Sequence, residues 1–274
     1  MIKRAAFGIG LGALILFSLA PSLWTLLTSV KTNAEIFSRP LTYLPAAWSI
    51  ENYSGMFEQR PFGLYIRSSL IVAAGSTLLA LLLAAPAAYA IARFRMRGKR
   101  TFELGMLAFS MIPAAVLLAP LTSAARTLGL SNSYLALASI HAALNLPFAV
   151  WMLTAFFRQL PVELEEAGRI DGYTRLGVLR AIVLPLAAPA LAATAILLFI
   201  FSWNEFVVSL ILMTRDSTRT VPVGIAMLSG ATAYEVPWGQ ISAAVVLTTF
   251  PVVAAVLAFQ RRIIQGLTAG AVKG

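Results

Sequence analysis

Residues 158–189 read RQLPVELEEAGRIDGYTRLGVLRAIVLPLAAP, and this polar stretch decides how the rest of the chain is interpreted. It lies between two long apolar runs and is too organised to be a linker. Pro161 suits the first turn of a helix, the glutamates that follow favour the positive end of the helix dipole, and residues 171–172 end it. Thr174 can cap a second short helix up to residues 184–185. The stretch therefore predicts a helix, a glycine turn and a helix that form a docking surface for another protein.

On both sides of this stretch the sequence is apolar. Hydrophobic residues make up 59% of the 274 residues and charged residues 12%, with a mean hydropathy of +0.83. About 20 helical residues cross the roughly 30 Å hydrocarbon layer, where the backbone has to satisfy its own hydrogen bonds. We therefore predict an all-α, polytopic membrane protein. Its six transmembrane helices are expected at about 7–30, 64–92, 104–125, 134–157, 186–213 and 239–260.

Basic residues are divided unequally between the two sides of these helices. The side that carries both termini holds fourteen Lys or Arg and the opposite side seven. Because basic loops stay in the cytoplasm, both termini are expected there, and the cluster at 93–100 is interpreted as a topological anchor. The first apolar run is longer than a signal peptide's apolar core, so we expect it to be retained. The predicted parts are a cytoplasmic N-terminus at 1–6, a transmembrane domain at 7–260 with a cytoplasmic loop at 158–185, and a cytoplasmic tail at 261–274.

Motifs for catalysis and for metal or nucleotide binding are missing from the sequence. The chain has no cysteine and a single histidine, which excludes disulfides and thiolate metal sites. It contains no phosphate-binding loop and none of the metalloprotease or serine hydrolase motifs. We therefore expect no enzyme activity, no cofactor and no metal in this chain. The net charge of +10 is explained by the membrane, and nucleic acid is not an expected partner.

A few polar side chains within the apolar runs are candidates for a substrate pathway. Glu205, beside Asn204, either faces a polar cavity or lies near the outer end of its helix and meets water. His141 and Asn145 share one helix face, and Trp151 lies well around from it. This part of the helix either offers hydrogen bonds and the Trp151 ring to a sugar, or it serves polar helix packing at a kink caused by Pro147.

Two outer segments, at about 31–61 and 214–238, are longer than turns. Each contains aromatic residues among prolines and charged residues. Either segment could touch an external partner, or lie at the membrane surface as a lid with aromatic anchors.

Several of these motifs together resemble one family. The residues E-A-G-R-I-D-G at 166–172, followed by I-V-L-P at 182–185 and by Pro189, are similar to the E-A-A-x-x-D-G … I-x-L-P-x-x-x-P loop of binding-protein-dependent ABC importer permeases. We call residues 158–185 the EAA-type loop. Further matching segments are 86–90 with 98–99, 128–134, 203–206 and 266–274. The resemblance extends over most of the chain and points to the MalG-like subunits of the carbohydrate branch.

The resemblance implies an ABC importer type I permease fold and a role in sugar import, with a di- or oligosaccharide such as maltose or trehalose as cargo. Implied partners are a homologous second permease subunit, two cytoplasmic ABC ATPase subunits that hold the ATP and Mg, an extracytoplasmic sugar-binding protein or lipoprotein, and the lipid of the bacterial cytoplasmic membrane. The implied ATPase-coupling residues are Glu166, Ala167, Gly168, Asp171, Gly172, Leu184 and Pro185. The implied ATPase contacts of the tail are Gly266, Leu267, Thr268, Gly270 and Lys273.

The sequence departs from the family pattern at two positions. Gly168 replaces the usual second alanine, which we expect to loosen the first docking helix, and Ser68 stands where many relatives have Asn before Ser69. Two other interpretations stay open at this point. One is an ABC permease for a solute other than a sugar, and the other is a secondary carrier driven by an ion gradient.

Overall fold

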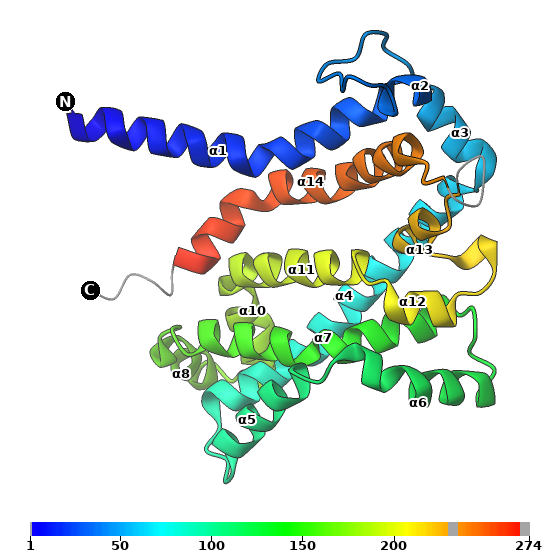
Figure 1. The fold of residues 1–274 in the computed structure, drawn as a ribbon. Helices are drawn as coiled ribbons and strands as arrows, with labels where there is room; N and C mark the ends of the chain where they lie inside the picture. The colour runs from blue at the N-terminus through cyan, green and yellow to red at the C-terminus, as the bar shows by residue number, and fades with distance from the viewer. Residues whose placement is uncertain (1, 230–234, 269–274) are drawn as a thin grey trace. The chain divides into compact units, whose positions relative to one another are not determined.

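A computed structural model describes residues 2–229 and 235–268, and within these residues every regular element is a helix (Figure 1). Four helices are long and apolar enough to cross a membrane, or five if the bent pair of Arg175–Leu186 and Ala188–Trp203 is counted as one span. The predicted all-α, multi-pass class is therefore confirmed. The four long helices are α1 (Ile2–Ser29), α4 (Phe62–Arg93), α7 (Tyr134–Phe157) and α14 (Trp238–Thr268).

Two predicted helices are interrupted in the structure. Residues 104–125 are divided between α5 (Lys99–Ser110) and α6 (Ala114–Thr127), because Pro113 has no N–H with which to continue the helix. Residues 186–213 are divided between α11 (Ala188–Trp203) and α12 (Val207–Leu212), with a break at 204–206. The remaining predicted helices agree with the structure to within a few residues, except that α14 continues to Thr268.

The chain divides into two compact units, which are described separately. The first comprises Met1–Gly63 and Val223–Pro251, and the second Leu64–Pro222 and Val252–Gly274, in each case as far as the residues are described. The short helices of the outer segments are α2 (Asn33–Ile36), α3 (Glu51–Gln59) and α13 (Val221–Ala226).

In the first unit, the outer segment after α1 folds around buried polar groups. Asn52, which is fully buried, donates from Nδ2 to the carbonyls of Ser29 (3.1 Å) and Lys31 (2.7 Å), and it lies directly against Gly239, where a side chain would not fit. The Glu35 carboxylate accepts hydrogen bonds from the Thr42 hydroxyl (2.9 Å) and the Ala46 N–H (2.8 Å). This segment is therefore a folded element.

In the second unit, α7 packs against both α5 and α11, and α6 packs against α12 (Figure 1). On α4 the buried alanines Ala80, Ala84 and Ala88 follow each other at intervals of four residues and form one face. Small residues at this spacing let neighbouring helices approach closely where no water drives the packing. The core of the second unit continues to the EAA-type loop through Phe157, Val178 and Val183.

Candidate functional site

The EAA-type loop contains the predicted helix, glycine turn and helix. The first helix, α8 (Val162–Ile170), has Glu163 and Glu165 in its first turn, where they favour the helix dipole. Gly172 follows with φ of 90°, a left-handed conformation that glycine adopts without steric cost. The Thr174 hydroxyl then accepts a hydrogen bond from the Gly177 N–H (3.1 Å) and caps α9 (Arg175–Val178). The predicted local structure is confirmed.

The second helix of the loop leads into a membrane-spanning helix. After α9 the chain continues through a π-helical turn, Leu179–Val183, and α10 (Leu184–Leu186), and then bends by 79° into α11. Pro189 contributes to this bend, because it cannot donate a hydrogen bond to the turn before it. The implied coupling residues Leu184 and Pro185 therefore lie where the loop joins α11.

The two faces of α8 differ in burial. Glu165 and Gly168 are buried, whereas Glu166 and Ala167 are exposed. The exposed side of the loop also carries Asp171 and Gly172. Large apolar side chains are exposed beside them, namely Val162, Leu164, Ile170, Tyr173 and Leu176. We call these five the apolar patch of the loop; Ile170, at 86% exposure, is the most open of them.

Glu165 fastens α8 to the end of α4. Its carboxylate accepts hydrogen bonds from Nε of Arg93 (2.6 Å) and from the hydroxyl of Tyr89 (2.9 Å). Arg93 also donates to the carbonyl of Leu160 (2.8 Å). We call these four residues the α4–α8 latch. The Glu165 and Arg93 side chains are only 9% and 11% exposed, so breaking their ion pair would leave a charge almost out of water.

Aromatic contacts extend the latch toward α9. The guanidinium of Arg175 lies 4.6 Å from the centre of the Phe94 ring, and Phe94 meets Tyr89 edge to face at 6.1 Å. This assembly is not among the features predicted from the sequence. Arg93 was expected only in the topological anchor, and Glu166, not Glu165, was the implied coupling residue. The signal that could have found it is the pair of adjacent glutamates, of which only one can face the bundle.

Gly168 lies where the two helices of the loop meet, and its expected loosening of α8 stays a prediction. A Cβ at this position would overlap the Cδ1 of Ile182, which comes from the π-helical turn of the same loop. Glycine therefore lets the two helices of the loop pack closely. Ser68 also has a role, because its hydroxyl lies 2.9 Å from that of Tyr134.

Two of the predicted pathway residues meet at the break between α11 and α12. His141, which is 1% exposed, lies between the Ser202 hydroxyl (2.8 Å from Nδ1) and the Glu205 carboxylate (3.1 Å from Nε2). Glu205 also accepts hydrogen bonds from the N–H groups of Val208 (2.8 Å) and Ser209 (3.0 Å), at the start of α12. Glu205 thus caps a helix and joins it to α7.

The other three pathway candidates are apart from this cluster. Asn145 is half-buried on α7, and the exposed Asn204 donates from Nδ2 to the carbonyl of Ile200 (2.8 Å). Trp151 is 57% exposed and borders a cavity between α5 and α7. The structure thus brings His141 and Glu205 together and leaves Asn145, Trp151 and Asn204 separate.

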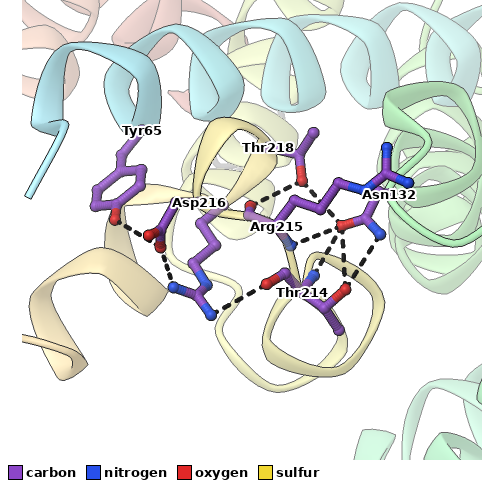
Figure 2. A network of polar contacts seen from close by, with 7 residues as sticks. Tyr65, Asn132, Thr214, Arg215, Asp216 and Thr218 are labelled. Atoms are coloured by element: carbon purple, nitrogen blue, oxygen red, sulfur yellow. Dashed lines mark hydrogen bonds and ion pairs between the residues drawn. The ribbon is translucent and has the colours of Figure 1, made fainter.

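The second outer segment is anchored at its start by Asn132 (Figure 2). The Oδ1 of Asn132 accepts hydrogen bonds from the N–H groups of Thr214 and Arg215, both at 2.9 Å, and from the Thr218 hydroxyl at 3.0 Å. Its backbone adopts a φ of 61°, which asparagine tolerates better than most residues. The hydroxyl of Tyr65, from α4, bonds Asp216 in the same segment (3.3 Å). We call residues 132 and 214–218 the outer clamp.

The implied tail contacts are only partly described. Gly266, Leu267 and Thr268 form the end of α14, and Gly270 and Lys273 lie outside the described residues. Within the described part of the chain, no group of three or more His, Asp or Glu residues is placed to hold a metal ion.

Comparison with known proteins gives consistent matches. Residues 76–269 match the sequence profile of the family described as the binding-protein-dependent transport system inner membrane component. The chain is 40% identical to the sulfoquinovosyl glycerol transport system permease protein SmoH of Agrobacterium fabrum, over 95% of this chain and 91% of that protein. It is 38% identical to the trehalose/maltose transport system permease protein MalG of Thermococcus litoralis, over 100% and 98% of the two chains.

Two further matches agree with these. The chain is 37% identical to the trehalose transport system permease protein SugB of Mycobacterium tuberculosis, over 99% of both chains. Among solved structures, a chain of a bacterial ABC transporter involved in the import of the acidic polysaccharide alginate superposes with a TM-score of 0.79, over 95% of this chain and 96% of that one. At 22% identity this likeness shows a common fold, as the resemblance implied.

Proposed function

The chain belongs to the family of binding-protein-dependent transport system inner membrane components, and from this premise we propose that it is the MalG-like permease subunit of an ATP-driven importer for a di- or oligosaccharide. The names of three relatives support a sugar as the cargo, since they specify trehalose, maltose and sulfoquinovosyl glycerol. The sequence offers no ATP site of its own, so the proposal assigns ATP and Mg to two partner ATPase subunits.

The exposed side of the EAA-type loop is the proposed contact with the ATPase. Glu166 and Ala167 lie on the open face of α8, beside the apolar patch of the loop. An exposed apolar patch bordered by charged residues is typical of a surface that another protein covers. The placement of Glu166, free of the latch and next to this patch, is the observation that carries the proposal. The tail residues 266–274 are proposed to add a second contact.

The proposed coupling follows from how the loop is attached. The α4–α8 latch joins the loop to α4, and the 79° bend joins it to α11. A movement of the ATPase that displaces α8 therefore displaces the ends of two membrane-spanning helices. ATP binding can then shift the permease pair between inward-facing and outward-facing states, because ATP favours the closed form of the ATPase dimer.

The remaining partners and the orientation belong to the same proposal. The excess of basic residues supports cytoplasmic termini and a cytoplasmic EAA-type loop. The two outer segments would then face the sugar-binding protein, and a homologous second permease subunit would complete the pathway. Of the pathway candidates, Asn145 and Asn204 are proposed to contact the sugar, while His141 and Glu205 hold the break between α11 and α12 in place.

The proposal is tested by Glu166→Ala in the complete importer, reconstituted with its partners in proteoliposomes. We expect loss of most of the sugar-stimulated ATP hydrolysis while the subunits remain assembled, because the Glu166 side chain makes no hydrogen bond or ion pair among the residues that the structure describes. The control is Leu82→Ala, which truncates an exposed side chain of α4 outside the EAA-type loop and both outer segments and should leave hydrolysis near the wild-type rate. Full hydrolysis by the Glu166→Ala importer would contradict the assigned docking surface.

A further inference from the structure

A cavity between α5 and α7 has a composition that the coupling function does not explain. Its volume is about 250 Å³. Polar and charged side chains border it together with exposed apolar ones. The residues that matter for its chemistry are Arg100, Glu103, Leu104, Trp151, Thr154 and Arg158.

The charged groups leave a surplus of positive charge at this cavity. Glu103 and Arg158 form an ion pair with each other, so their charges largely cancel. Arg100, one residue into α5, has no ion pair or hydrogen bond among the described residues. Four further basic residues precede Arg100 in the chain and strengthen the local positive potential, namely Arg93, Arg95, Arg97 and Lys99.

A buried hydroxyl in the cavity wall also lacks a partner. Thr154 is 5% exposed, and its Oγ1 makes no hydrogen bond within the described residues. An unsatisfied buried hydroxyl is unfavourable and is usually paired with a protein group, water or a ligand. The hydroxyl itself has almost no accessible surface, so the group that the cavity offers to a bound molecule is the Arg100 cation.

The rest of the cavity is suited to hydrocarbon. Leu104 and Trp151 are each 57% exposed, and a second, largely apolar cavity shares Met106, Pro147 and Val150 with the first. Along α7, Arg158 and Trp151 are separated by about 10 Å, at 1.5 Å per residue. This is the depth over which a phospholipid changes from headgroup to acyl chain.

We propose that this cavity binds an anionic phospholipid of the cytoplasmic leaflet, with its headgroup phosphate at Arg100 and its acyl chain along Leu104 and Trp151. A neutral sugar would not need the surplus positive charge, and a free anion would not need the apolar wall. Basic pockets between transmembrane helices are known to recognise such headgroups. The choice of leaflet rests on the proposed orientation, whereas the binding itself does not.

The test uses the full chain in nanodiscs that contain phosphatidylcholine and phosphatidylglycerol. Because the chain has no cysteine, Ala155→Cys introduces one fluorophore site at the cavity wall. We expect nitroxide-labelled phosphatidylglycerol to quench this fluorophore more strongly than nitroxide-labelled phosphatidylcholine does. The matched control, Leu82→Cys on the exposed face of α4, should show no preference between the two lipids. Equal quenching by both lipids at the cavity would overturn the proposal.

Charge variants give effects of opposite sign. Arg100→Gln is expected to reduce the preference for phosphatidylglycerol about fivefold, the factor that corresponds to about 1 kcal/mol per basic residue near an anionic surface. Glu103→Gln is expected to increase it, since Arg158 then also becomes available to the phosphate. If both variants lower the unfolding temperature and leave the preference unchanged, the charges are structural and the proposal fails.

Two further outcomes would also overturn the proposal. Competition by inorganic phosphate equal to that of the lipid would indicate an anion site without a role for the acyl chain. Loss of the lipid preference in the assembled importer would show that another subunit covers the cavity. We expect neither outcome. The preference for phosphatidylglycerol should persist in the presence of inorganic phosphate and in the assembled importer.

Discussion

The α4–α8 latch and the outer clamp both fasten a loop to the helices of the second unit, but they do so with different chemistry. The latch depends on one buried ion pair, between Arg93 and Glu165, supported by the Tyr89 hydroxyl. The outer clamp uses a neutral amide, Asn132, which accepts four hydrogen bonds from one short segment. A buried charge without its partner is far more unfavourable than a lost neutral hydrogen bond.

Because of this difference, the two loops can loosen in different ways. The segment held by the outer clamp can loosen in steps, since each hydrogen bond is weak and water can replace it. The latch cannot loosen in steps, because its ion pair is either formed or broken and a broken pair leaves a buried charge. That behaviour suits the loop proposed to transmit a movement. If the contact between α8 and α4 loosened easily, α8 could move without moving α4.

The largest expected effect comes from Glu165→Gln. The substitution leaves the Arg93 guanidinium buried without a countercharge, and we expect a loss of about 3–5 kcal/mol in the free energy of unfolding. Thermal unfolding of the purified chain in detergent measures it. Glu166→Gln, one residue along α8, is the control and should leave the unfolding temperature unchanged while it lowers ATP hydrolysis by the importer. Equal unfolding temperatures for the two variants would show that the latch does not hold α8.

A substitution in the outer clamp should have a smaller effect on stability than Glu165→Gln has. Asn132→Ala removes the acceptor for the Thr214 and Arg215 N–H groups and is expected to cost about 1–3 kcal/mol locally. We expect faster tryptic cleavage after Arg215 and Arg219, measured as the rate of fragment formation. Asn132→Asp keeps the accepting oxygen and should restore most of the protection, whereas Asn132→Gly keeps only the backbone freedom and should not. If glycine protects as well as aspartate, the hydrogen bonds are not what holds the segment.

Packing inside the EAA-type loop can be tested with a substitution whose effect on stability is expected to change sign between two backgrounds. Gly168→Ala is expected to cost about 1 kcal/mol, because its Cβ displaces the end of the Ile182 side chain. In an Ile182→Val background that atom is gone, and the same substitution should become neutral or stabilising by about 1 kcal/mol, since alanine favours a helix over glycine. Unfolding temperatures of the four variants provide the test. A stabilising effect in the wild-type background would support the expectation that glycine loosens α8.

The smallest expected effect concerns the outer segment of the first unit. A hydrogen bond from the Ala46 N–H, with help from the Thr42 hydroxyl and the charge of Lys31, lowers the pKa of Glu35 below its ordinary value of 4.5. A pKa lowered by folding stabilises the fold above the ordinary value, and the stabilisation is lost as the pH falls through the folded pKa. Amide exchange of residues 31–61, corrected for its intrinsic pH dependence, should therefore accelerate in acid. Glu35→Gln should flatten that response, and an unchanged response would assign it to another group.

Much of this structure could be predicted from local signals. The Asp171-Gly172 end of α8 and the Thr174 cap of α9 depend on turn chemistry that is visible in the sequence. The apolar runs correctly predicted a multi-pass helical membrane protein. The break before Pro113 had a signal, but the uncharged run around it outweighed the proline.

Other features depended on tertiary contacts. Which of Glu165 and Glu166 faces inward is set by Arg93, about seventy residues earlier, since the large apolar side chains of α8 are exposed and do not fix its rotation against the bundle. The break at 204–206 contains no proline or glycine, and it is held by the bonds of Glu205 to His141 and to α12. Such long-range pairs are not encoded in the spacing of nearby residues.

The central claim is that the latched loop carries the movement of a separate ATPase into helices that have no energy source of their own. The most direct test is sugar uptake by proteoliposomes that hold this chain, the second permease subunit and the sugar-binding protein, with and without the ATPase subunits and ATP. We predict uptake only when both the ATPase and ATP are present. Uptake without them, driven by a proton or sodium gradient, would contradict the account and favour a secondary carrier.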